Sequence, residues 1–205
     1  MNRPKDNKIP VRALFYLYDG IELLDFAGPM EVFVVAGFEV ITVAKTKSPI
    51  ISQGVLKIIP DYCIDDAPFS NIIAFFGGDA ANVYNDPVVI QWLKNLKSPD
   101  FYFSVCTGAF ILGKAGLLDH LSVTTWHGKI EELKREIPRA NVLSNVRFVD
   151  NGRVITTAGV SAGIDGALHL VEKILGGRAA AEVVRYMEYD GRSANNGLII
   201  KSPYF

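Results

Sequence analysis

One cysteine lies where it could act as a nucleophile. The stretch FSVCTGAFILGKAGLL, residues 103–118, places Cys106 between a short apolar run and a helix-like segment that opens with Thr107. A residue at such a junction occupies a sharp turn, a nucleophile elbow, with its side chain raised above the sheet. A helix beginning there would favour the thiolate and lower the pKa of Cys106. The alternative is a buried, inert thiol, since free cysteines are among the most buried residues.

An acidic residue and a glycine pair follow two other apolar runs. Asp25 stands in LLDFAGP, and Gly77 with Gly78 in FFGGDAANV. Asp25 could exchange protons with substrate, or it could be a turn or helix-capping residue. The glycines suit a tight turn in which a Cβ would clash. Their second interpretation is an oxyanion hole, with the N–H of Gly78 and that of Thr107 directed at developing negative charge.

The surrounding pattern predicts how these residues are positioned. Apolar runs alternate with helical segments, which is typical of a mostly parallel sheet covered on both faces by helices. Ligand-binding groups in such sheets lie beyond the carboxyl ends of the strands, so the three turns should converge there. The predicted strands cover 11–18, 38–44, the start of 71–83, 101–105, 121–125 and a hairpin within 146–159, with another hairpin at 50–60; the predicted helices cover 28–36, 87–96, 107–116, 161–176 and 179–189.

Composition narrows the class of protein. The chain has 205 residues, 49% of them hydrophobic, and a net charge of -1 without a basic run, so we expect one domain over 1–205 and no nucleic-acid partner. We expect residues 1–10 to be flexible and 190–205 to form a C-terminal extension. No apolar stretch suits a signal peptide or a membrane span, which predicts a cytoplasmic protein without membrane association. Cys63 and Cys106 lack the spacing of a zinc site or a disulfide framework, and we expect neither metal nor organic cofactor.

Five segments together resemble a known family. The stretches SVCTGAFILGKAGLL, LLDFAGPMEVF, FFGGDAANV, VTTWH and TTAGVSAGIDGALHLV resemble, in the family's order, the ThiJ/PfpI family of the class I glutamine amidotransferase-like superfamily. The resemblance runs from about Val11 to Tyr189 and is strongest to the isonitrile hydratase subgroup and to the amidotransferase-like domains of AraC-type regulators. It implies a single flavodoxin-like domain, a three-layer α/β sandwich with Cys106 at the elbow. It also implies a homodimer and a small-molecule substrate.

The resemblance further implies roles for individual residues. Cys106 would be the nucleophile and Asp25 its acid–base partner, with Glu31 an alternative acid. Thr107 stands where protease-like members have a histidine, which argues against amide hydrolysis, and its hydroxyl would hydrogen-bond Asp25 or the reacting water. His127 is one place later than the histidine of the pattern T-T-H-W, so a structural role and a role as base both stay open.

The implied activity is the hydration of a small electrophile. The leading hypothesis is a lyase that converts an isonitrile to an N-substituted formamide through Cys106. One alternative is a glyoxalase-like hydratase of reactive dicarbonyls. Another is a domain that binds a ligand or senses oxidation without turnover, as in the AraC-type regulators.

Overall fold

The computed structural model describes residues 10–79, 83–190 and 197–200. Within these residues an eight-stranded sheet has the order β12-β10-β11-β7-β6-β1-β2-β5, and every neighbouring pair is parallel except β10 with β11. The expected α/β sandwich with a mostly parallel sheet is confirmed. The strands of this sheet are β1 (Arg12–Tyr16), β2 (Glu39–Ala44), β5 (Tyr62–Cys63), β6 (Ile72–Phe75), β7 (Phe101–Val105), β10 (Phe148–Asp150), β11 (Val154–Thr157) and β12 (Gly197–Ile199).

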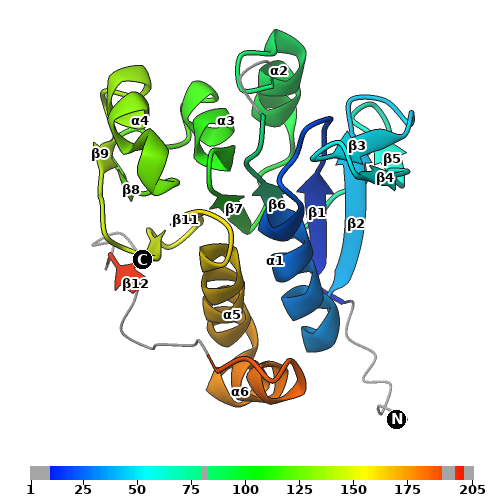
Figure 1. The fold of residues 1–205 in the computed structure, drawn as a ribbon, viewed down its shortest axis with the longest axis vertical. Coiled ribbons are helices and arrows are strands. Elements are labelled where there is room, and N and C mark those ends of the chain that lie inside the picture. The colour runs from blue at the N-terminus through cyan, green and yellow to red at the C-terminus, as the bar shows by residue number, and fades with distance from the viewer. Residues whose placement is uncertain (1–9, 80–82, 191–196, 201–205) are drawn as a thin grey trace.

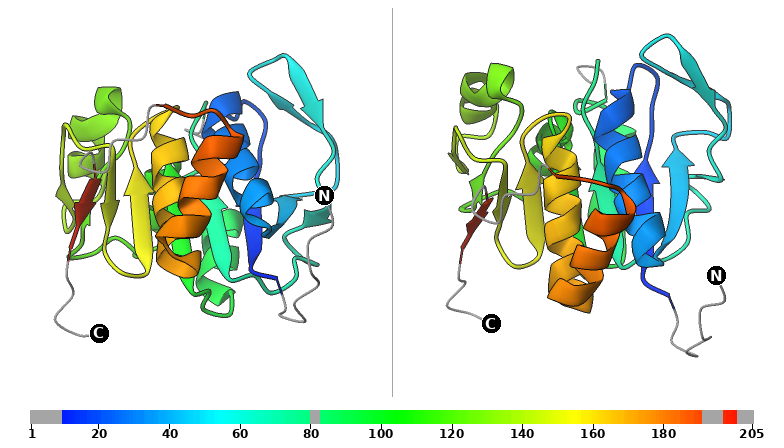
Figure 2. Two further views of the ribbon diagram at one scale, coloured as in Figure 1. Left: turned by 90° about the horizontal axis from the view of Figure 1, so that it is seen from below. Right: turned by 60° about the horizontal axis from the view of Figure 1, so that its bottom comes forward.

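Helices cover both faces of this sheet. Helices α1 (Leu23–Ala36), α5 (Ala162–Leu175) and α6 (Gly177–Tyr186) lie side by side on one face, as Figure 2 shows. Helices α2 (Pro87–Asn95) and α3 (Gly108–Lys114) cover the other face (Figure 1). A smaller lobe beside the sheet contains a parallel pair, β8 (Ser122–Val123) with β9 (Asn141–Val142), together with the short helix η1 (His127–Lys129) and α4 (Ile130–Glu136). The antiparallel hairpin β3 (Ile50–Ser52) with β4 (Leu56–Ile58) extends beyond β2.

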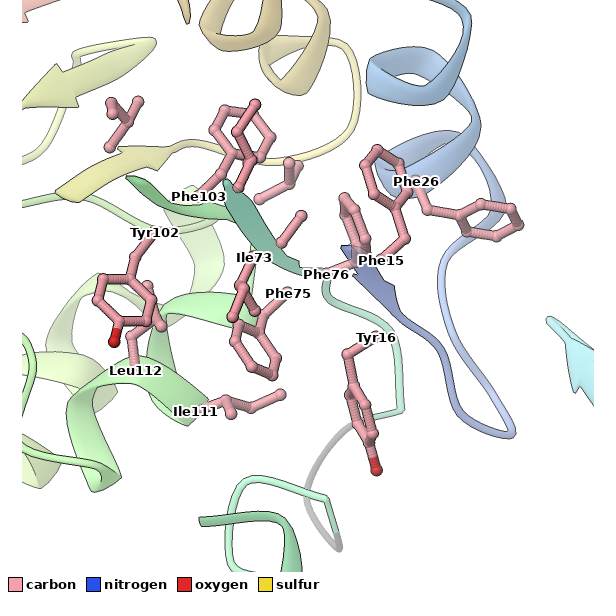
Figure 3. Packing of buried hydrophobic residues seen from close by; sticks show 14 of the residues in the cluster. Phe15, Tyr16, Phe26, Ile73, Phe75, Phe76, Tyr102, Phe103, Ile111 and Leu112 are labelled. Carbon is pink, nitrogen blue, oxygen red and sulfur yellow. The ribbon is translucent and has the colours of Figure 1, made fainter. Parts of the chain in front are cut away.

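Alternation along the buried strands divides the core into two layers. Phe15 and Phe103 both contact Phe33 of α1, on one face of the sheet. Tyr16 and Phe75 instead pack on Trp92 of α2, and Figure 3 shows Phe75 directed toward the α3 side. Successive side chains of a strand point to opposite faces, so each strand contributes to both layers. Packing in these two layers holds in place the strands whose carboxyl ends carry the candidate site.

Several predicted elements match, and one differs in a way that matters for the site. The hairpins at β3–β4 and β10–β11 and the helices α2, α3, α5 and α6 lie where the sequence predicts them. Helix α1, however, begins at Leu23 rather than Gly28, so Asp25 lies in its first turn and Pro29 lies inside it. A proline removes one helical hydrogen bond, and burial of the apolar side chains of α1 offsets that loss. The prediction that Asp25 precedes the helix is therefore wrong.

Other predictions concern the edges of the fold. The strand predicted at 121–125 is the two-residue β8, outside the main sheet, and the segment 127–136 forms η1 and α4, which the sequence did not predict. The helix start predicted within 71–83 includes residues 80–82, which lie outside the described residues. Residues 1–9, 191–196 and 201–205, which belong to the predicted flexible start and C-terminal extension, also lie outside them. Among the described residues, no helix is long and apolar enough to cross a membrane.

Candidate active site

Cys106 occupies a strained turn between β7 and α3. Its φ is +58°, in the left-handed region that costs an L-residue about 1–2 kcal/mol. Three hydrogen bonds hold this backbone: the Cys106 N–H lies 3.0 Å from the carbonyl oxygen of Ala158 and 3.3 Å from that of Thr157, and the Thr125 hydroxyl donates to the Cys106 carbonyl over 2.7 Å. The chain thus holds a strained conformation that directs one side chain above the sheet, as a nucleophile elbow does.

Asp25 is fully buried, and two backbone groups fix its carboxyl. The N–H of Gly77 donates to Oδ2 over 2.8 Å, and the N–H of Val160 donates to Oδ1 over 2.9 Å. Val160 itself has a φ of +54°, which is unusual for a β-branched residue. Both carboxyl oxygens are therefore oriented by main-chain donors that come from distant parts of the sequence.

Gly77 brings the thiol and the carboxyl together. A Cβ placed on Gly77 would lie 2.7 Å from the Cys106 Sγ and 2.8 Å from the Asp25 Oδ2. The two reactive atoms thus flank one point, and only a hydrogen atom fits there. Each of these two side chains shifts the pKa of the other. The predicted convergence of Asp25, Gly77 and Cys106 is present in the structure.

The protonation of this pair differs from the sequence-based expectation. Burial raises the pKa of Asp25 to about 6, against the opposing effect of its two backbone hydrogen bonds. Burial, and then the nearby Asp25 carboxylate, raise the pKa of Cys106 to about 12, although the N–H of Thr107 favours the thiolate. The expectation of a thiol pKa lowered by the helix is wrong here, because burial of the sulfur and the nearby Asp25 carboxylate outweigh the effect of the Thr107 N–H. At neutral pH the resting pair is a thiol beside a carboxylate.

Thr107 and Gly78 have only part of the geometry expected of them. The buried Thr107 hydroxyl favours the thiolate but makes no well-formed hydrogen bond within the described residues, so it does not bond Asp25. Gly78 has a φ of +133° and forms an isolated antiparallel bridge with Ile21. Its Cβ would lie 2.3 Å from the Gly20 carbonyl oxygen, so glycine is required there. An oxyanion hole built from the N–H groups of Thr107 and Gly78 stays a prediction.

His127 and Glu31 lie outside the contacts that the pair makes. His127 is exposed at the start of η1, with its ring 5.0 Å from that of Trp126, and it lines a cavity bounded by the β8–α4 lobe. Glu31 is exposed on α1. Neither is among the residues that most strongly shift the pKa of Asp25 or Cys106. Asp25 is therefore the acid that the structure brings to the sulfur.

Three residues that the sequence analysis did not single out complete the surroundings. Val160 and Thr125 hold the carboxyl and the elbow, respectively. Tyr18 is buried, donates to the Phe76 carbonyl over 2.9 Å, and has a pKa raised by burial and by the charge of Asp25. The order of motifs offered no sign of Val160, because a β-branched residue does not signal a left-handed turn. No group of three or more potential metal ligands occurs among the described residues.

Comparison with known proteins identifies the family of the chain. The chain is 30% identical to an isonitrile hydratase of Pseudomonas putida over 178 residues. This match covers 85% of this chain and 77% of that protein. It is 23% identical to the HTH-type transcriptional regulator CdhR of Pseudomonas aeruginosa over 82% of this chain and 52% of the regulator. The crystal structure of a ThiJ/PfpI family protein from Pseudomonas syringae superposes with a TM-score of 0.82 at 26% identity, over 91% of this chain and 78% of that one. The model of the DJ-1/PfpI family matches residues 11–173, and the chain belongs to that family.

Proposed function

We propose that this chain hydrates a small isonitrile to an N-substituted formamide, with Cys106 as nucleophile and Asp25 as acid–base group. The observation that carries the proposal is the thiol–carboxyl pair at Gly77, where the Asp25 carboxyl is fixed by two N–H donors. The similarity to the Pseudomonas putida isonitrile hydratase supports the choice of substrate class.

A thiol beside a carboxylate suits an isonitrile, because its terminal carbon must gain both the sulfur and one proton. As the Cys106 sulfur bonds to the terminal carbon of the isonitrile, the thiol proton passes to the Asp25 carboxylate. Asp25 returns this proton to the same carbon, which gives a thioimidate on Cys106. A carboxylate with a pKa of about 6 can take up and release a proton near neutral pH.

Water then completes the reaction. The Asp25 carboxylate accepts a proton from a water molecule that adds to the thioimidate carbon. Asp25 returns this proton to the nitrogen, which gives a tetrahedral adduct. As the carbon–sulfur bond then breaks, the proton of the added hydroxyl passes through Asp25 to the sulfur, which restores the thiol and leaves the formamide carbonyl. The sum is one isonitrile and one water to one formamide, with no oxidant or reductant.

Parallel assays separate this proposal from its rivals. The protein is incubated with cyclohexyl isonitrile or with methylglyoxal, and N-cyclohexylformamide and lactate are measured by mass spectrometry, with Cys106→Ala as the blank. We expect the formamide. Lactate alone would favour the glyoxalase-like alternative. Neither product, with a thiol that iodoacetamide still alkylates, would favour a sensing domain, which the similarity to CdhR supports.

We also propose that two copies of the chain associate through the β3–β4 hairpin and α1. Gln53 in the hairpin donates to Glu22, beside the start of α1, over 2.6 Å, so the two elements adjoin. Exposed apolar side chains occur on both, which is typical of interaction surfaces. They are Leu24, Val34, Ile51, Val55, Leu56 and Ile59.

A charge placed on this apolar surface should weaken the association. We expect Leu56→Asp to shift the dimer–monomer equilibrium toward monomer by about tenfold or more, since it buries a charge against apolar atoms. Sedimentation velocity over a concentration series measures the shift. Leu175→Asp, at a similarly exposed leucine on α5, is the matched control. A wild-type protein that stays monomeric, or an equal response to both variants, would contradict the proposed interface.

A further inference from the structure

The cavity that His127 lines takes no part in the proposed chemistry. Its volume is about 600 Å³, within the range of pockets that bind small molecules. It lies between the β8–α4 lobe, the loop before β10 and the turn from β11 to α5. Cys106 and Asp25 do not line it, but Thr125 and Val160, which hold them, form part of its wall.

One side of the cavity is an aromatic surface held in place. Trp126 is 37% exposed, although it is a large apolar residue. A Cβ on Gly128 would lie 2.6 Å from its ring, and one on Gly159 would lie 2.5 Å from it, so the indole rests against both glycines. Ile130 and Val146 add aliphatic surface to the same cavity. A flat or elongated apolar group could pack there.

Arg147 also lines this cavity, and hydrogen bonds fix the orientation of its guanidinium. Its guanidinium bonds the Asp165 carboxylate through Nε and the Ser161 hydroxyl through Nη2, and the Asp165 side chain is almost fully buried. Tyr189 donates a further hydrogen bond to Asp165 over 3.1 Å. These contacts use two of the five N–H groups of a guanidinium. The remaining donors suit a planar, bidentate acceptor such as a carboxylate.

The acidic residue in the lining does not oppose an anionic ligand strongly. The Glu131 side chain is 81% exposed and lies 2.7 Å from the Lys134 ammonium. Its charge is therefore screened by water and paired, whereas Arg147 is held against a buried partner.

We propose that this cavity binds a small organic acid, with its carboxylate on Arg147 and its apolar body on Trp126. The cavity is a site separate from the thiol–carboxyl pair, so the proposal holds whether or not the chain hydrates isonitriles. The ligand class follows from an arginine and a tryptophan that line one cavity, each held in place by its neighbours.

Fluorescence titration tests the proposal directly. The chain has two tryptophans, so Trp92→Phe leaves Trp126 as the reporter. The probes are 3-phenylpropionate and its neutral amide, 3-phenylpropanamide. We expect saturable binding of the acid, about tenfold or more tighter than that of the amide. Binding should persist in Cys106→Ala, which separates this site from the catalytic one.

Matched variants locate the contact. Arg147→Lys keeps a positive charge beside Asp165 but loses the planar fork, and it should weaken binding of the acid about tenfold while the amide is unaffected. Arg153→Lys, at an arginine that bonds Ser98 and Pro99 elsewhere, is the control. Val146→Phe, which fills the cavity from a half-buried position, should weaken both probes. Equal affinity for acid and amide, no saturable change, or an acid affinity untouched by both Arg147→Lys and Val146→Phe would overturn the proposal.

Discussion

Replacing Cys106 by alanine is expected to abolish formamide production, with a loss of about 10³-fold or more, because no other nucleophile adjoins Asp25 among the described residues. The fold should survive, since the change removes one atom beside Gly77 and leaves the three backbone hydrogen bonds of the elbow intact. Product is measured by mass spectrometry, and the fold by circular dichroism.

Two further variants show that the loss belongs to the chemistry. Cys63→Ser changes the other cysteine, whose thiol bonds Asp66, and should keep full activity. Cys106→Gly should be inactive yet more stable than Cys106→Ala by about 1 kcal/mol, because glycine adopts a φ of +58° without strain. Urea unfolding compares the two. Formamide production by either Cys106 variant above the rate measured without protein would rule out the nucleophile assigned here.

The overall fold could be predicted from the sequence because it depends on the regular spacing of apolar residues. Apolar runs such as FYFSV alternate with helical segments, and a parallel sheet covered on both faces is the arrangement that buries them all. The same reasoning placed Cys106 and Gly77 at strand ends, where the structure brings them together. These predictions needed only local patterns and the topology of parallel sheets.

Other features depend on contacts that local patterns do not contain. Asp25 lies inside α1 because the helix begins at Leu23. Gly28 and Pro29 instead indicated a helix start five residues later. The raised thiol pKa arises from burial and from a carboxylate far away in the sequence. The left-handed Val160 likewise follows from the tertiary turn that directs its N–H to Asp25. A helix N-terminus in the sequence predicted a thiolate, but the low-polarity surroundings outweigh that effect.

Asp25 controls the ionisation of the pair, and its removal should change reactivity in two opposite directions. In Asp25→Asn the thiol loses a neighbouring negative charge, so the pKa of Cys106 should fall and alkylation by iodoacetamide at mildly alkaline pH should become faster. Turnover should nevertheless fall about 10²–10⁴-fold, because no carboxylate remains to carry the proton between sulfur, carbon and water. A more reactive sulfur with a slower enzyme is a combination that simple misfolding does not produce.

The pH dependence gives the sharpest test of Asp25 as the base. Because the carboxylate form accepts the thiol proton, wild-type kcat/KM should rise as pH increases through about 6 and then level off. Asp25→Asn should lack this rise. Glu31→Gln, which removes an exposed carboxylate from the same helix, should keep both the rise and the rate. If the rise persists in Asp25→Asn, or disappears in Glu31→Gln, the proton carrier is another group, and the two N–H donors on Asp25 serve only to hold α1 to the sheet.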